Sequence, residues 1–218
     1  TLSNNLTKDS LVIPGSSGAC SEVTMQAIRI PKGCRVFNTE GLGSMGFGVP
    51  AAIGGCLASG NKKTICIDGD GGFMMNMQEL EVVRRLNLPI KFFVLNNQGY
   101  GSIRTTQNTH FGGNLVASDA SSGLTLPEIQ RVSHTFEIPW VPILFNKELS
   151  GGIQMVLNMD GPVICEVMVE INHETAPKAG VYKTSDGKFA ALPMEDLKPL
   201  LPREEFFSNM LVKPVTTE

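Results

Sequence analysis

Short apolar runs alternate with helical patterns along the whole chain, and this alternation limits the fold more than any other feature of the sequence. Such an order is typical of parallel strands joined by helices that cover both faces of a sheet. It predicts the α/β class, with a doubly wound, mostly parallel sheet. The expected strands are 11–13, 35–38, 64–68, 90–95, 141–144 and 163–169, and the expected helices are 45–59, 77–86, 126–136 and 147–157.

The length and composition predict one main domain with an appended tail. Of the 218 residues, 42% are apolar and 18% are charged, which is enough to bury a full core. We expect a polar linker at 1–10, the main domain at 11–172 and a carboxyl-terminal arm at 173–218. Segments 107–123 and 172–188 lack apolar periodicity and are expected to be long surface loops. Because the sequence opens with Thr1 rather than Met, we expect a fragment of a longer protein.

The charge, the hydropathy and the cysteines exclude several classes of partner. The formal net charge is -3 and aromatic residues make up 6%, so the basic surface of a nucleic-acid-binding protein is missing. The longest apolar stretches are too short or too rich in glycine to span a bilayer. Five cysteines form no C-x-x-C pair and are typical of reduced, buried thiols. We therefore expect a cytoplasmic protein with no nucleic-acid or membrane partner.

A first glycine cluster follows the expected strand at 35–38. Gly41, Gly43 and Gly46 fit the pattern G-x-G-x-x-G, which in nicotinamide and flavin sites is followed about 20 positions later by an acidic residue at a strand end. Asp68 and Asp70 lie near enough to keep a nicotinamide-dependent oxidoreductase as an alternative. A tight strand-to-helix turn without any ligand would also explain these glycines.

A second glycine cluster surrounds Asp70 at the end of the expected strand 64–68. Two further polar residues, Asn96 and Asn97, stand at the corresponding end of the next expected strand, 90–95. A helix of about ten residues runs back roughly 15 Å, and a strand of about six residues returns roughly 20 Å, so Asp70 and Asn97 are expected side by side. One carboxylate and one amide oxygen suit Mg²⁺, which takes its other ligands from water and phosphates. The alternative is a helix cap at Asp70 and a simple turn after Asn96.

These motifs resemble those of a known family. The segment from Gly69-Asp70-Gly71 to Asn96-Asn97 resembles the signature of thiamine diphosphate enzymes, and residues 41–54 are similar to the corresponding segment of acetolactate synthase (acetohydroxyacid synthase) large subunits. The resemblance covers about residues 10–205. It implies that 11–172 is a carboxyl-terminal domain with the thiamine diphosphate-binding fold, which takes thiamine diphosphate and Mg²⁺ as cofactors.

The resemblance also assigns roles to single residues. The Asp70 carboxylate, the Asn97 side-chain oxygen and the Gly99 backbone carbonyl would hold the metal. The backbone amides of Gly71 and Gly72 would meet the diphosphate. Gly43 and Met45 would touch the aminopyrimidine, although ordinary core packing is the alternative for a methionine at this place. The full set of cofactor-binding residues implied is Gly43, Ser44, Met45, Gly69, Asp70, Gly71, Gly72, Asn97, Gly99 and Tyr100.

In this family a glutamate that activates the pyrimidine ring lies in a separate amino-terminal domain, contributed across a dimer interface. No segment of this chain resembles that domain, so no catalytic residue is assigned here and the chain alone is expected to be inactive. The resemblance implies decarboxylation or carboligation of 2-keto acids by a homodimer or tetramer, and it leaves a requirement for FAD in the intact enzyme open. A non-catalytic assembly module with the same fold is a further alternative.

The chain departs from acetolactate synthases at positions that bear on the substrate. Ala19 and Cys20 replace a Gln-His pair near the diphosphate, and Ser102 and Thr106 replace a Met and a Trp that shape the acceptor pocket. The sequence therefore leaves the identity of the acceptor substrate open. Arg104 is expected either to meet a substrate or a loop, or to be a solvated surface charge.

Overall fold

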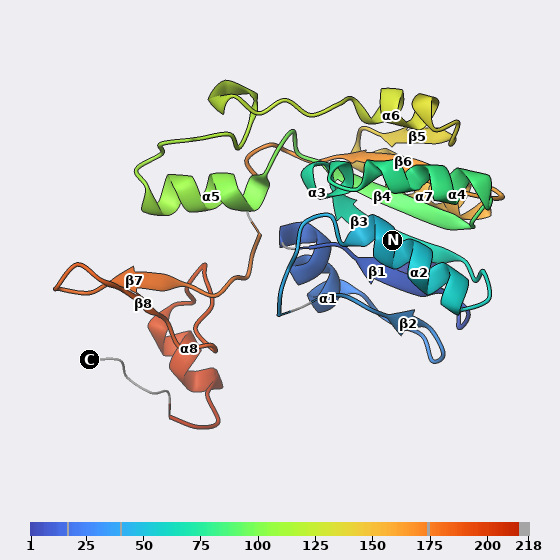
Figure 1. Cartoon of the computed structure of the whole chain (residues 1–218). Helices are drawn as coiled ribbons and strands as arrows, with labels where there is room; N and C mark the ends of the chain where they lie inside the picture. The colour runs from blue at the N-terminus through green and yellow to red at the C-terminus, as the bar shows by residue number, and fades with distance from the viewer. Residues whose placement is uncertain (17, 40, 174, 214–218) are drawn as a thin grey trace. The chain divides into compact units, whose positions relative to one another are not determined.

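The protein is described from a computed structural model that covers residues 1–16, 18–39, 41–173 and 175–213. The chain divides into two compact units, Thr1–His173 and Glu174–Glu218. The first unit contains a six-stranded sheet in the order β2-β1-β3-β4-β6-β5, in which every neighbouring pair is parallel (Figure 1). Its strands are β1 (Leu11–Pro14), β2 (Arg35–Val36), β3 (Thr64–Gly69), β4 (Ile90–Asn96), β5 (Trp140–Ile143) and β6 (Val163–Met168). The predicted fold class is confirmed.

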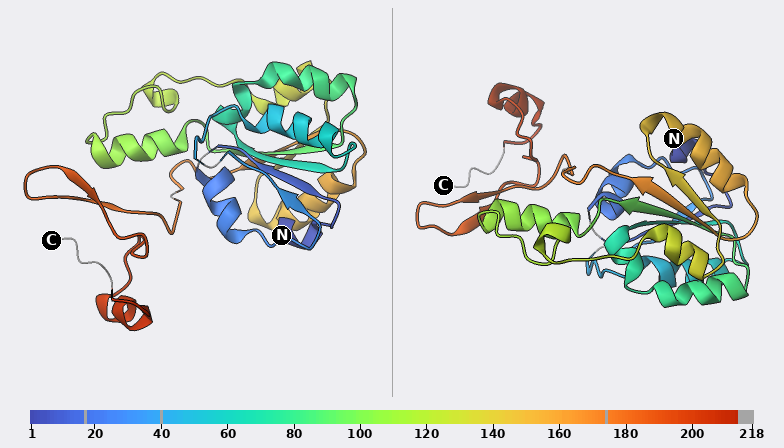
Figure 2. Two further views of the ribbon diagram at one scale, coloured as in Figure 1. Left: turned by 60° about the horizontal axis from the view of Figure 1, so that its bottom comes forward. Right: turned by 90° about the horizontal axis from the view of Figure 1, so that it is seen from above.

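Helices cover both faces of this sheet. The α-helices that the structure describes in the first unit are α1 (Thr24–Ala27), α2 (Gly48–Ala58), α3 (Asp70–Met74), α4 (Leu80–Arg85), α5 (Gly101–His110), α6 (Ile129–Thr135) and α7 (Leu149–Asn158). Of these, α5 contributes no residue to the core on either face of the sheet. One core cluster packs α2, α4 and α6 against one face, and a second cluster packs α7 against the other (Figure 2). Strand side chains alternate between the two, since Phe92 belongs to the first cluster and its neighbour Phe93 to the second.

Several helix predictions need correction. The helix expected at 45–59 begins at Gly48, because Gly46 has a φ of +85°, which no right-handed helix accommodates. The helix expected at 126–136 covers only Ile129–Thr135. Residues 101–110 form α5, so the loop expected at 107–123 begins after its end. Helix α5 is rich in polar residues and lacks the apolar period that predicts a helix.

The amino-terminal segment 1–10, expected as a linker, contains a 3-10 helix at Leu2–Asn5. Leu6 is 8% exposed and packs into the second core cluster. Because this burial removes an apolar side chain from water, it ties the segment to the first unit.

The described part of the second unit, residues 175–213, contains a short antiparallel hairpin and a helix. Strand β7 (Val181–Lys183) pairs with β8 (Phe189–Ala191), so part of the segment 172–188, expected as a loop, is a strand. Helix α8 (Arg203–Asn209) begins at Arg203. The Arg203 guanidinium donates to both carboxylate oxygens of Asp196, at 2.7 and 3.0 Å. This two-pronged ion pair fixes the start of α8 against the preceding loop and holds the pKa of Asp196 below its usual value.

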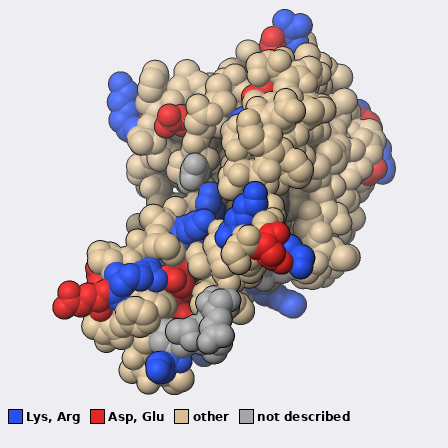
Figure 3. Space-filling model, turned by 90° about the vertical axis from the view of Figure 1, so that its left-hand side faces the viewer, with Lys and Arg blue, Asp and Glu red and all other residues tan. Residues whose placement is uncertain are grey.

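Charged side chains of both signs are mixed on the face drawn in Figure 3, and most of that face carries uncharged residues. Among the helices that the structure describes, none has the length and apolar character needed to cross a bilayer.

Candidate functional site

The candidate site lies where β3 and β4 end. These two strands are parallel and pair Asp68 with Val94 and Gly69 with Leu95, so their carboxyl ends reach the same edge of the sheet. Chain connections leave β1 and β3 in opposite directions along the sheet. In doubly wound sheets such a switch point opens a crevice in which ligands bind. The predicted excursion from Asp70 to Asn97 therefore returns the chain to its starting edge.

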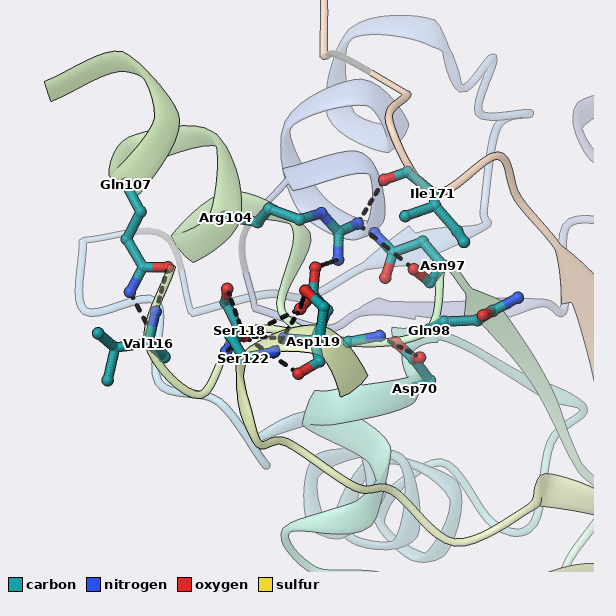
Figure 4. A network of polar contacts seen from close by, with 12 residues as sticks. Asp70, Asn97, Gln98, Arg104, Gln107, Val116, Ser118, Asp119, Ser122 and Ile171 are labelled. Carbon is teal, nitrogen blue, oxygen red and sulfur yellow. Dashed lines mark hydrogen bonds and ion pairs between the residues drawn. The ribbon is translucent and has the colours of Figure 1, made fainter. Parts of the chain in front are cut away.

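Three oxygen atoms converge at this edge. Asn97 Oδ1 lies 2.8 Å from the carbonyl oxygen of Gly99 and 3.3 Å from Asp70 Oδ1. With the amide turned over, its nitrogen would instead donate to both of these oxygens. Asp70 Oδ2 accepts a hydrogen bond from the Gly99 amide at 2.9 Å, so the carboxylate and the turn are joined directly (Figure 4). The spacing predicted that Asp70 and Asn97 lie side by side, and the resemblance added Gly99; the structure brings the three residues together.

The two adjacent asparagines have different contacts. Asn96 Nδ2 donates to Glu166 Oε1 on β6 at 2.6 Å, and Asn96 Oδ1 accepts from the Gln98 amide at 2.9 Å. The first bond fixes the end of β4 to β6, and the second holds the turn that follows β4. Gln98 has a φ of +60° and Gly99 a φ of +143°, so the chain reverses sharply there. Because of this reversal, the Asn97 side chain points toward Asp70.

The Asp70 carboxyl is buried, and its burial raises its pKa. It is 3% exposed, and this loss of hydration raises its pKa from 3.8 to about 6, while the amides of Gly99 and Gly71 act in the opposite direction. A cation beside the carboxylate would favour the ionised form. Burial of a carboxylate that faces other oxygens is costly unless a proton or a cation joins them.

The glycines next to Asp70 are required by close side chains. A Cβ added to Gly71 would clash with the ring of Tyr100, and one added to Gly72 would lie 2.6 Å from Asp68 Oδ1. Both glycines lie in α3 and are buried. The tight packing therefore explains why this strand-to-helix turn needs residues without side chains, whatever ligand it holds.

Asp68 lies beneath the turn and is enclosed by glycines. Its carboxylate is 2% exposed, and Cβ atoms added to Gly15 or Gly48 would clash with it. Burial raises its pKa to about 7, against the hydrogen bond from the Gly69 amide. A carboxylate enclosed in this way does not reach a ribose hydroxyl. Moreover, the Gly41–Gly46 turn follows β2, an edge strand, which argues against the nicotinamide alternative.

The first glycine cluster forms an exposed loop beside α3. Gly43 has a φ of +58° with open space around it, and Ser44 is exposed. The Met45 side chain is 39% exposed, so it is available to a ligand and is not a core residue. Asn76 Nδ2 donates to the Gly46 carbonyl oxygen at 2.8 Å and ties this loop to the segment after α3.

Cys20, which replaces a histidine of the resembling family, is buried beside the site. Its sulfur would lie 3.7 Å from a Cβ at Gly69. Burial, with Asp68 and Asp70 nearby, raises the pKa of the thiol well above its usual value. Cys20 therefore stays protonated and packs as a small apolar group rather than acting as a nucleophile.

Arg104 and Asp119 complete the site, and the sequence did not predict their contact. The expectation of a solvated Arg104 is wrong, because the side chain is 5% exposed and its Nη2 donates to the carbonyl oxygens of Asn97 and Ile171. Asp119 caps the 3-10 helix Ala120–Ser122. A sequence signal for that cap existed, since Asp119 is followed three positions later by Ser122.

Comparisons with known proteins agree with this geometry. Residues 16–167 match the family described as "Thiamine pyrophosphate enzyme, C-terminal TPP binding domain". The chain is 33% identical over 148 residues to "Acetolactate synthase large subunit" of Pyropia yezoensis, covering 68% of the chain and 25% of the relative. It is 30% identical over 187 residues to "Acetolactate synthase 2, chloroplastic" of Zea mays, covering 83% and 29%. With "Acetolactate synthase isozyme 2 large subunit" of Escherichia coli (strain K12) the identity is 36% over 132 residues, covering 61% and 24%. The chain thus spans about a quarter of the length of these relatives.

Proposed function

Because this chain belongs to the thiamine pyrophosphate enzymes, as a C-terminal TPP-binding domain similar to those of acetolactate synthase large subunits, we propose that it anchors the cofactor diphosphate through Mg²⁺. The convergence of Asn97 Oδ1, the Gly99 carbonyl oxygen and the Asp70 carboxylate carries the proposal. With Asn97 Oδ1 facing the other two, these oxygens repel one another unless a cation lies between them, whereas the turned amide would donate to both by itself. A divalent cation satisfies all three at once.

The donor set fits magnesium. It contains one carboxylate, one amide oxygen and one backbone carbonyl, and Mg²⁺ prefers oxygen ligands with its remaining places filled by water and phosphate. Gly71 and Gly72 lie at the start of α3, and backbone amides at the start of a helix attract an anion. These amides would meet the diphosphate, with Gly69 and Tyr100 beside it.

The exposed loop is proposed to hold the other half of the cofactor. Gly43, Ser44 and Met45 are accessible, and the Asn76 bond to Gly46 fixes the loop next to α3. The Met45 side chain would contact the aminopyrimidine ring of the cofactor. When bound, thiamine diphosphate would supply the electron sink for decarboxylation or carboligation of a 2-keto acid. The residues of this chain bind and orient it.

We propose that turnover requires an amino-terminal pyrimidine-binding domain, from the same chain or a second one, in a homodimer or tetramer. The relatives extend well beyond the matched region, since the chain covers 24% to 29% of their length. The chain by itself is therefore proposed to bind the cofactor weakly and to be inactive.

Titration calorimetry tests the proposal. The chain should bind thiamine diphosphate only when Mg²⁺ is present, and Asp70→Asn or Asn97→Ala should weaken binding at least about 10- to 100-fold, as expected for lost metal coordination. Asp9→Asn is a matched control, because this carboxylate is exposed on the first unit and pairs only with the exposed Lys62 among the described contacts. Equal affinity in the presence of a chelator, or in Asp70→Asn, would contradict the proposal.

A further inference from the structure

Arg104 is a buried cation that reaches three separate parts of the chain. From α5 its Nη2 donates to the carbonyl oxygen of Asn97, at 3.4 Å, and to that of Ile171, which follows β6. Its Nη1 lies 3.9 Å from Asp119 Oδ2. Figure 4 shows the guanidinium between the Asn97 turn, Asp119 and Ile171. The Arg104 side chain is 5% exposed, and these contacts offset part of the hydration that its guanidinium loses.

Asp119 is itself held firmly. Its Oδ1 accepts from the Ser121 hydroxyl at 2.7 Å, from the Ser122 hydroxyl at 2.9 Å and from the Ser122 amide at 3.1 Å. These bonds, with the charge of Arg104, lower the pKa of Asp119 and keep it ionised. The Asp119 carboxylate is thus a fixed anion on the loop, and its Oδ2 faces Arg104.

The loop that carries Asp119 also touches the ligand turn through its backbone. The Tyr100 amide donates to the Ser118 carbonyl oxygen at 2.9 Å, and Gly99 pairs with Asp119 in an isolated bridge. A Cβ at Gly99 would clash with the Ser118 carbonyl oxygen. The turn is therefore clamped by Asp70 on one side and by the Ser118–Asp119 loop on the other, with Arg104 joining loop and turn.

From these contacts we propose that Arg104 is a positioning residue, which holds the Asn97 and Gly99 oxygens in place for the metal by linking their turn to Asp119 and Ile171. This inference rests on the proposed function. Arg104 itself touches neither metal nor diphosphate in this assignment. Loss of its guanidinium removes one restraint from the turn, whose φ angles at Gln98 and Gly99 are both positive, so the three oxygens are held less firmly in one arrangement.

Hydrogen exchange of the chain without metal or cofactor tests the structural half. In Arg104→Met the amides at 97–101 should lose protection about tenfold or more, the effect of losing one hydrogen bond from a charged donor. The strand at 90–95 should keep its protection. Arg131→Met is the matched control, because the Arg131 side chain is 79% exposed and pairs with Glu128. Unchanged exchange at 97–101 in Arg104→Met would overturn the inference.

Mg²⁺-dependent binding of thiamine diphosphate tests the functional half. Arg104→Met should weaken it about 10- to 100-fold, as for other residues that orient metal ligands, and Arg104→Lys should restore part of the loss. Val156→Ala, in α7 and the second core cluster, lowers stability without touching the site and should leave affinity unchanged. Normal affinity in Arg104→Met, together with lost affinity in Asp70→Asn, would overturn the positioning role alone.

A second variant covers the case in which Arg104→Met does not fold. Asp119→Asn keeps an oxygen for Ser121 and Ser122 but removes the charge that faces Arg104. It should produce the same change in exchange at 97–101 with a smaller amplitude, and no change there would overturn the inference. If the wild-type chain shows no metal-dependent binding, the proposed function fails, whereas the exchange data still decide whether Arg104 holds the turn.

Discussion

Lys91 is a buried lysine in the middle of β4. It is 1% exposed, and its ammonium donates to the carbonyl oxygens of Met159 and Gly161 at 2.6 and 2.5 Å, just beyond the end of α7. The Lys91 ammonium thus lies beside the carboxyl end of α7, where the negative end of the helix dipole favours a cation. Burial, and then Lys63 nearby, lower the Lys91 pKa from 10.5 to about 8, although Asp160 acts in the opposite direction.

This pKa gives a prediction about stability and pH. The folded state releases the Lys91 proton near pH 8, whereas the unfolded chain keeps it until about 10.5. The unfolded state therefore binds more protons between these values, so the free energy of unfolding should gain a positive contribution from Lys91 as pH rises, with a slope of at most about 1 kcal/mol per pH unit. Urea unfolding of the wild type and Lys91→Met at several pH values measures it.

Lys91→Met should lack this contribution, because methionine fills the same space without a proton to release. Lys62→Met is the matched control, since Lys62 is exposed and its ion pair with Asp9 lies at the surface. Identical pH slopes in the wild type and Lys91→Met would show that Lys91 remains charged in the folded protein.

At the scale of elements, α2 offers two glycines with opposite surroundings. Gly48 begins the helix, and an added Cβ would clash with Asp68 Oδ2 and lie 3.2 Å from the Cys66 sulfur. Gly54 is exposed near the middle, and an added Cβ would meet no atom within 4 Å. Gly48→Ala should lower the free energy of unfolding by about 1–3 kcal/mol through overpacking. Gly54→Ala should raise it by about 0.5–1 kcal/mol, because alanine favours the helix.

Chemical unfolding of the two variants checks this contrast, and each serves as the control of the other. An equal effect of both substitutions would mean that the Asp68 carboxylate moves aside easily. In that case the tight enclosure around Asp68 would not limit the start of α2.

The β3 to β4 excursion could be predicted from sequence because its signals are local. Apolar runs mark both strands, and the lengths between Asp70 and Asn97 return the chain to one edge whatever the details of the helices. Arg104 could not be predicted in the same way. Its burial depends on Asp119 and Ile171, which lie far along the chain, and helix α5 has no apolar stripe that would indicate a buried face.

At the scale of the whole molecule, both core clusters belong to the first unit. Every residue of the two clusters, together with the partly buried side chains packed on them, lies within residues 2–167. The hairpin β7–β8 and α8 form the second unit. The sequence predicted an arm at 173–218 but not its hairpin. Strands of three residues are too short to show the alternation of apolar and polar side chains that predicts a strand.

We expect the first unit to fold without the second. A chain ending at His173 should keep a single cooperative unfolding transition with a midpoint close to that of the full chain, because it retains every residue of both clusters. Circular dichroism of thermal unfolding measures this, with the full chain as reference. A broad transition, or a large fall in the midpoint, would show that residues beyond 173 contribute to the stability of the first unit.

The enclosure of Asp68 also restricts how this sequence can change. The Asp68 carboxylate leaves no room for a Cβ at three glycines from different segments of the chain, Gly15, Gly48 and Gly72. Substituting any of them first introduces a collision, whereas shortening Asp68 first opens room for all three. In evolution or directed mutagenesis, a change at Asp68 should therefore lower the cost of later substitutions at these three glycines.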